Sequence, residues 1–182
     1  MARFLIILYF FIPVIGMAQG HKGSVEECAP MKNGKICYTD EVEIDATKNQ
    51  IFDAINKWAT KNYGKDVFLS NVSTNKNKGT ILVSSKIEML LNDTDKTFIK
   101  FKMYITCLDN KYLVETKDIT YQYDPEDNKK FKTYKAEDVI ANNGKSNTIS
   151  LIADPELFCN ATFFFVENLF ADVFSAASEA EK

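Results

Sequence analysis

The chain has 182 residues, of which 46% are hydrophobic and 26% charged, and its formal net charge is −3. These values are typical of a globular protein and allow one domain with one core. Arg3 is the only arginine, and arginine is the residue best suited to bidentate contact with phosphate or guanine. A mildly acidic chain with so little arginine is a poor nucleic-acid binder, so we expect no nucleic-acid partner.

The first eighteen residues have the pattern of a secretory signal peptide. Arg3 is followed by an apolar run over residues 4–12, and the small residues Gly16 and Ala18 precede Gln19. The run is shorter than the roughly 20 apolar residues that a bilayer requires. We therefore predict a signal peptide over residues 1–18, a mature chain that begins near Gln19, no integral membrane span, and a periplasmic or secreted location.

An irregular lead-in, a strand and a helix are predicted next. Residues 19–35 contain Gly and Pro without an apolar period, whereas residues 36–44 alternate with their even positions facing inward. Thr47 and Gln50 have the spacing of a capping box at a helix start. Apolar residues then recur at helical spacing, which predicts a helix over residues 48–62.

Four strands in series follow the helix. Residues 67–72 form a short strand, and residues 80–91, 96–107 and 111–123 alternate between apolar and polar side chains, with polar turns between them. The alternation slips inside the last strand, between Val114 and Ile119, so we expect a β-bulge there. Strands joined by short turns form an antiparallel meander with one covered face.

The C-terminal part is predicted to be a long loop and a long helix. Residues 124–153 are polar and long for a connection. Asp154 and Pro155 form a strong helix start, and the helix should extend to Ala177. Its apolar arc is wider than one sheet requires, so we consider a second surface on it, with possible homo-oligomer formation, made by Phe163, Val166, Phe170 and Phe174.

The four cysteines of an exported chain are candidates for disulfides. They allow three pairings. We favour Cys28–Cys37, which are close in sequence, and Cys107–Cys159, because both are predicted to face the core. Buried free thiols are the alternative for all four.

Few residues suggest catalysis. His21, the only histidine, lies in the lead-in, whereas catalytic and zinc-binding imidazoles must be held in place. The acidic pairs Asp93/Asp95, Glu126/Asp127 and Glu137/Asp138 could act as general acid and base or bind calcium, but lie in turns or loops. We therefore expect no catalytic residues, no cofactor and no metal, with a small carboxylate-dependent hydrolase as the alternative.

The outward face of the predicted sheet is the remaining candidate for binding. Aromatic side chains among lysines could bind a peptide, a glycan or a partner protein. The simpler interpretation is a solvated sheet face with cross-strand pairs. The candidate residues are Leu82, Phe98, Lys100, Lys102 and Tyr104.

Several segments resemble a family of exported bacterial domains with a fold like that of TATA-box-binding protein (TBP). They are residues 38–45, residues 57–59, residues 78–81, Tyr104, and the Asp118-Ile119 pair. The resemblance implies an α+β fold, with a five-stranded antiparallel sheet and two helices on one face, in the order β-α-β-β-β-β-α.

This fold would make residues 36–177 a single domain, followed by a tail at residues 178–182. The family has no assigned activity, so no functional residues are implied by the resemblance. We therefore expect a non-catalytic binding or assembly module of the bacterial envelope, whose partner is an unknown protein, peptide or glycan.

Overall fold

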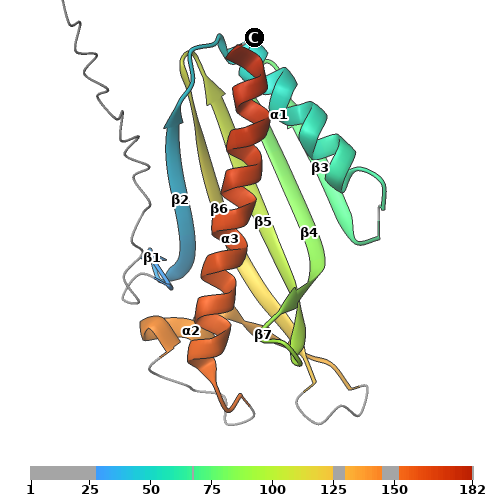
Figure 1. Cartoon of the computed structure of the whole chain (residues 1–182), viewed down its shortest axis with the longest axis vertical. Coiled ribbons are helices and arrows are strands. Elements are labelled where there is room, and N and C mark those ends of the chain that lie inside the picture. Colours follow the sequence, from blue (N-terminus) through green and yellow to red (C-terminus); the bar gives the residue numbers. More distant parts are fainter. Residues whose placement is uncertain (1–27, 67, 125–129, 145–151, 182) are drawn as a thin grey trace, which may run out of the picture.

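A computed structural model describes residues 28–66, 68–124, 130–144 and 152–181 (Figure 1). The predicted signal peptide, most of the lead-in with His21, and two stretches of the predicted loop lie outside the described residues. The helices are α1 (Lys48–Tyr63), α2 (Ala136–Ile140) and α3 (Pro155–Ala177), with 3-10 turns η2 (Ala141–Gly144) and η3 (Ser178–Glu181). The strands are β1 (Met31–Lys32), β2 (Lys35–Glu43), β3 (Ser70–Asn75), β4 (Thr80–Leu90), β5 (Lys96–Leu108), β6 (Lys111–Tyr123) and β7 (Lys132–Lys135).

The strands form one antiparallel sheet in the order β1-β2-β6-β5-β4-β3, with β7 also paired to β6. The α+β class and the antiparallel sheet are confirmed, but the predicted number of five strands is wrong. The two additional strands are β1, within the predicted lead-in, and β7, within the predicted loop. β2 pairs with residues 111–117 of β6 and β7 with residues 120–123, so β7 occupies the part of that edge that β2 leaves free.

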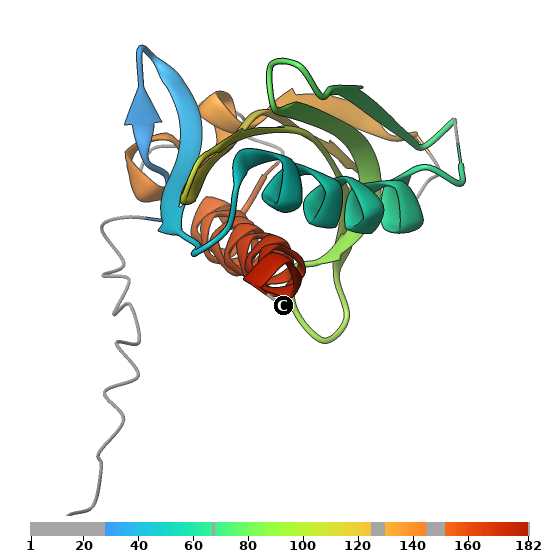
Figure 2. The same cartoon turned by 90° about the horizontal axis from the view of Figure 1, so that it is seen from above.

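The core lies between the sheet and the helices. Figure 2 shows α1 and α3 on the same side of the sheet. The alternation of β4 and β5 directs Ile81, Val83, Ile99, Phe101 and Met103 toward the helices, and all five are buried. Removing such side chains from water is the main driving force for this arrangement.

Both long helices begin where the sequence predicts. The Thr47 N–H donates to Gln50 Oε1 at 3.0 Å and the Gln50 N–H to Thr47 Oγ1 at 3.4 Å, which completes the capping box of α1. The Leu157 N–H donates to Asp154 Oδ1 at 3.0 Å at the start of α3. These bonds satisfy backbone donors that the first helical turn leaves free.

α3 is the core helix of the domain. With η3 it covers Pro155–Glu181, the one described helix whose length and composition would allow a membrane crossing, with a mean hydropathy of 1.3. Its Cys159, Thr162, Val166 and Val173 are fully buried in the core. The Thr162 and Tyr121 hydroxyls are 2.7 Å apart, so a hydrogen bond also joins α3 to β6.

The predicted bulge lies in β6. Lys100 pairs with Thr120 but Lys102 pairs with Lys117, so β6 has one residue more than β5 between these pairs. Asp118 takes a left-handed backbone conformation there, with φ of 54°. The extra residue reverses the phase of β6, so that Thr116 and Ile119 both face inward.

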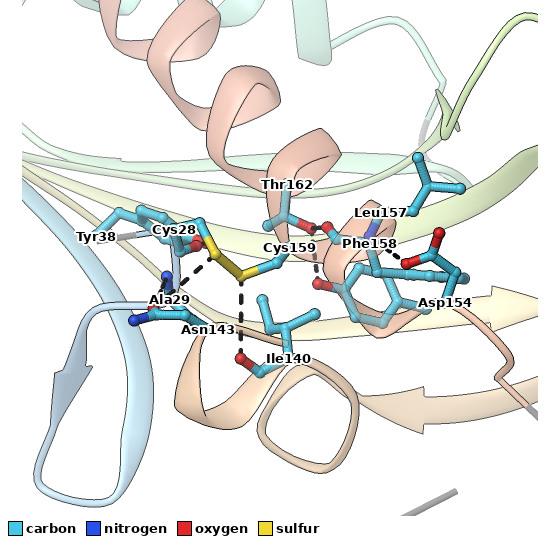
Figure 3. Close-up of a disulfide and its surroundings, with 11 residues drawn as sticks. Cys28, Ala29, Tyr38, Ile140, Asn143, Asp154, Leu157, Phe158, Cys159 and Thr162 are labelled. Carbon is cyan, nitrogen blue, oxygen red and sulfur yellow. Dashed lines mark hydrogen bonds between the residues drawn. A yellow bond between two sulfur atoms is a disulfide. The ribbon is translucent and has the colours of Figure 1, made fainter. Parts of the chain in front are cut away.

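A disulfide joins Cys28 to Cys159, with the two Cα atoms 5.5 Å apart (Figure 3). Both favoured pairings are therefore wrong, and Cys37 and Cys107 are buried free thiols. The Cys37 side chain lies on the opposite sheet face, the face of Lys117 and Glu115. Cys107 lies beside the Gly79 turn, at the far end of the sheet from the start of α3.

The disulfide belongs to a group of contacts that hold the N-terminal segment to the domain. The Tyr38 hydroxyl donates to the Cys28 carbonyl oxygen at 2.6 Å, and the Ala29 N–H donates to Asn143 Oδ1 at 3.0 Å (Figure 3). The segment before β1 is thus attached to α3, β2 and η2.

Gly79 should be far less tolerant of alanine than Gly34. Both have positive φ, 69° and 74°, but a Cβ on Gly79 would lie 2.6 Å from the Cys107 carbonyl oxygen, whereas nothing lies within 4 Å at Gly34. We expect Gly34→Ala to lower the free energy of unfolding by about 1 kcal/mol, the cost of the left-handed backbone alone. Gly79→Ala should lower it by about 3 kcal/mol. Urea unfolding measures both, and equal losses would contradict the close approach at Gly79.

Loss of the disulfide should destabilise the domain strongly, because it closes a loop between residues 131 positions apart. We expect Cys159→Ser to lower the free energy of unfolding by about 2–5 kcal/mol in urea. Cys37→Ser is the matched control, since it makes the same substitution at a buried free thiol and keeps the disulfide, and it should cost less than about 1 kcal/mol. Peptide mapping without reduction should recover Cys28 linked to Cys159; a link that includes Cys37 or Cys107 would contradict the structure.

Candidate functional site

The candidate site is the open sheet face, defined as the face of β4, β5, β6 and β2 opposite α1 and α3. The five residues predicted from the sequence lie together on it. Tyr104 is paired with Leu82, Lys102 with Ser84, Lys100 with Lys86, and Phe98 with Glu88. Their side chains share a face because strand residues two positions apart point the same way.

Lysines and a second ring hold the aromatic side chains of this face. Lys86 Nζ lies 4.7 Å from the centroid of the Phe98 ring, and Phe131 meets that ring edge-on at 5.8 Å. Lys117 Nζ lies 4.4 Å from the centroid of the Tyr104 ring. Each cation–π contact contributes about 0.5–1 kcal/mol at an exposed site, so the rings are positioned while remaining accessible.

Glu115 of β6 is the centre of an ionic cluster on the same face. It accepts hydrogen bonds from Lys117 and from Lys32 Nζ, the latter at 3.2 Å. The Lys117 contact, followed by that of Lys32, lowers the pKa of Glu115, and the same contact raises the pKa of Lys117. Burial, with the nearby Glu115 charge, raises the pKa of Cys37, so this thiol is not activated as a nucleophile.

Asp118, at the bulge, has a similar role beside this cluster. Its carboxylate accepts from Lys35 Nζ at 2.9 Å and from Lys102 Nζ at 3.1 Å. These two hydrogen bonds lower the pKa of Asp118. Because Lys35 belongs to β2 and Lys102 to β5, one side chain of β6 ties both neighbouring strands together.

A shallow hollow of about 470 Å³ lies next to the Glu115 cluster. Its lining residues include Lys32, Thr39, Tyr104, Thr106 and Glu115. The hollow offers an aromatic ring and charges of both signs. Such a surface has groups that can bind a peptide or a sugar without catalysing a reaction.

The second predicted surface, on the last helix, is corrected in part. Val166 and Phe170 are buried in the core, because α3 presents that side to the sheet and α1. Phe163 is partly buried, and Phe174 is 49% exposed. Phe164, which was not among the candidates, is 64% exposed, so an interface through α3 could use only part of the predicted set.

In each acidic pair that the structure describes, at least one carboxylate has a structural contact. Glu137 accepts the Ile36 N–H at 3.1 Å, which joins α2 to β2. Asp95 accepts from the Asn92 side chain at 3.1 Å within a turn, while Glu126 and Asp127 lie outside the described residues. Within the described ranges, no group of three or more His, Cys, Asp or Glu could hold a metal ion.

Sequence reasoning missed Lys32, Glu115, Lys117 and Asp118. The local sequence did not determine which face of the sheet these side chains would occupy. Lys32 lies in the predicted lead-in, and the other three lie around the bulge of β6. The slipped alternation of β6 was the available signal, because it places residues 115 and 117 outward before the bulge and residue 119 inward after it.

An antiparallel sheet with two long helices on one face and the other face open is a TBP-like domain. A TBP-like protein from Parabacteroides distasonis ATCC 8503 is 75% identical over 82% of this chain and 97% of its own, with a TM-score of 0.81. The family model described as a domain of unknown function (DUF4468) with TBP-like fold matches residues 38–122. This chain therefore belongs to the DUF4468 family.

A more distant structure supports the fold alone. A DUF4468 family protein from Bacteroides ovatus ATCC 8483 is 22% identical over 82% of this chain and 90% of its own, with a TM-score of 0.67. None of the curated proteins matches this chain.

Glu115→Gln should lower the free energy of unfolding at neutral pH, and this loss should become smaller in acid. A carboxyl whose folded pKa is lowered stabilises the fold above its unfolded pKa, about 4.3 for Glu, and loses that contribution as the pH falls through the folded value. We expect Glu115→Gln to cost about 1 kcal/mol at neutral pH and progressively less below about pH 4, measured by urea unfolding across pH. Glu88→Gln, which removes an exposed pair with Lys96, should change stability by less than about 0.5 kcal/mol. A Glu115→Gln loss that is unchanged at low pH would contradict this assignment.

Proposed function

We propose that this protein is an exported, non-catalytic binding module of the bacterial envelope, whose open sheet face binds a protein, peptide or glycan partner. The observation that carries the proposal is the asymmetry of the sheet. Two helices cover one face, while the other presents Phe98, Tyr104 and their lysines without a covering element in the described parts of the chain. Positioned, accessible rings beside charged groups are typical of binding surfaces.

The charge of the open sheet face supports a partner with acidic or hydroxyl groups. Its carboxylates include those of Glu41, Glu43, Glu88, Glu115 and Asp118. They are outnumbered by lysines, which include Lys32, Lys35, Lys86, Lys96, Lys100, Lys102, Lys111 and Lys117. The face is therefore locally positive on a chain of net charge −3, and such a local field attracts groups of opposite charge.

Two features support export. Residues 1–18 have the three-part pattern of a signal peptide. The Cys28–Cys159 disulfide favours an oxidising compartment, because thiols remain reduced in the bacterial cytoplasm. The disulfide also lies only ten residues after Ala18, so the N-terminal part that remains after cleavage would be attached to the domain.

A carboxylate-dependent hydrolase has less support. A carboxyl that acts as general acid needs a raised pKa, which burial or a second carboxylate would provide. The clustered carboxyls of the open sheet face have lowered pKa values, because lysines neutralise Glu115 and Asp118. Their arrangement suits ion pairing between strands rather than proton transfer.

A photo-crosslinking amino acid at position 104 should capture the partner in native cells, whereas the same group at Lys57, exposed on α1, should not. Lys100→Glu should lower the yield from position 104 by roughly tenfold, the loss that about 1.4 kcal/mol of binding energy represents. Equal labelling from both positions would contradict binding at the open sheet face. Separately, N-terminal sequencing of the protein from the envelope fraction should start near Gln19; an uncleaved cytoplasmic chain would contradict export.

A further inference from the structure

The outer edge of β2 is free from Thr39 onward in the described part of the chain. β1 pairs only with Lys35 and Ile36, and the Cys37 N–H donates to the Pro30 carbonyl oxygen at 2.9 Å. At the other end, the Ile44 N–H donates to Asn110, which precedes β6, at 3.0 Å. The backbone groups of successive strand residues point to opposite edges of the strand. The N–H and C=O groups of the odd residues of β2 therefore point away from β6, toward the outer edge.

The backbone groups of Thr39, Glu41 and Glu43 therefore form a strand edge without a neighbouring strand. Asp40 Oδ1 accepts the Glu41 N–H at 2.8 Å. An added strand would replace this exposed side-chain acceptor with a backbone carbonyl oxygen. A row of such donors and acceptors is a template for strand addition.

Two hollows flank this edge, one on each face of the sheet. On the open sheet face, the 470 Å³ hollow reaches Thr39 and Glu41. On the helix side, a groove of about 380 Å³ lies between Val42 of β2 and Phe170 and Phe174 of α3. Side chains of a strand alternate between the two faces, so a strand added to β2 would direct them into both hollows.

The surroundings of the edge are acidic. Asp40, Glu41, Glu43 and the groove residue Glu167 are exposed, and Lys111 pairs with Glu41 at 2.6 Å. A second copy added edge to edge would bring these carboxylates together, and like charges on paired strands are destabilising. The charge instead favours a segment that carries lysine or arginine.

We propose that residues 39–43 of β2 bind an extended, basic segment of a partner protein as an additional strand of the sheet. Valine-like side chains of that segment would lie on Phe170 and Phe174, and its basic side chains would meet the acidic groups of the edge. This inference rests on the proposed binding function, and the two proposed sites share only the hollow beside Thr39.

The test uses the full chain, purified after secretion, and a short capped fluorescent peptide in which Lys alternates with Val. Binding is measured by anisotropy, and amide hydrogen exchange of Thr39 and Glu43 reports its position. We expect the peptide to slow exchange at both amides about tenfold. The same peptide with Glu in place of Lys should bind at least about tenfold more weakly.

Thr39→Pro tests the hydrogen bonds of the edge. The Thr39 N–H points outward, so proline there leaves the pairing with β6 intact, and it should weaken peptide binding about tenfold or more. Thr39→Val, which keeps the N–H, is the matched control. A peptide with N-methyl groups on one edge gives the same test on the unaltered chain, so the result does not depend on the folding of the proline variant.

The outcomes separate the two proposals. Lys100→Glu should leave peptide binding unchanged, because Lys100 lines neither hollow. Three results would overturn strand addition: equal binding of the Lys and Glu peptides, equal binding by Thr39→Pro and Thr39→Val, or a dimer joined through β2. None of these results would affect binding at the open sheet face.

Discussion

The constraint on which the structure depends is that the long strands are apolar on one face only. β4, β5 and β6 present Ile81, Phe101 and Tyr121 to the same side, and that side must be removed from water. α1 and α3 provide the cover, with α3 crossing the sheet along its length (Figure 1). The opposite face carries mostly polar and charged side chains with a few apolar ones such as Phe98, so it needs no covering helix and can take part in binding.

The bulge in β6 reconciles that constraint with the ionic clusters. A regular strand would have kept Lys117 and Ile119 on one face, which would either bury a charge or expose an apolar side chain. The left-handed residue Asp118 instead reverses the phase, so Ile119 is buried while Lys117 stays outside. The same residue binds Lys35 and Lys102, so the irregularity in one strand also stabilises its position against two others.

Features determined by local sequence were predictable, and features determined by distant contacts were not. Three features that depend only on neighbouring residues were predicted and are confirmed: the Thr47 capping box, the Asp154 cap and the bulge of β6. Cys28 pairs with a residue 131 positions away, and β7 exists because β6 continues beyond the end of β2. The alternation of apolar and polar residues predicted five side chains of the open sheet face. The contact between Lys32 and Glu115 could not be predicted in this way, because it depends on how β1 and β6 lie in the folded sheet.

The N-terminal attachment determines where the sheet ends. The disulfide to α3 and the hydrogen bond from Tyr38 fix Cys28, and this places Pro30 against Cys37 and β1 beside Lys35 and Ile36. Asn33 and Gly34, both with positive φ, form the turn of that hairpin. Because Cys28 is bonded to α3, only the few residues between Cys28 and the turn lie beside β2, so β1 does not extend along the rest of that strand. The Cys28–Cys159 disulfide thus limits the pairing of β1 to the first residues of β2. The acidic residues farther along β2 disfavour pairing of the remaining edge with a second copy.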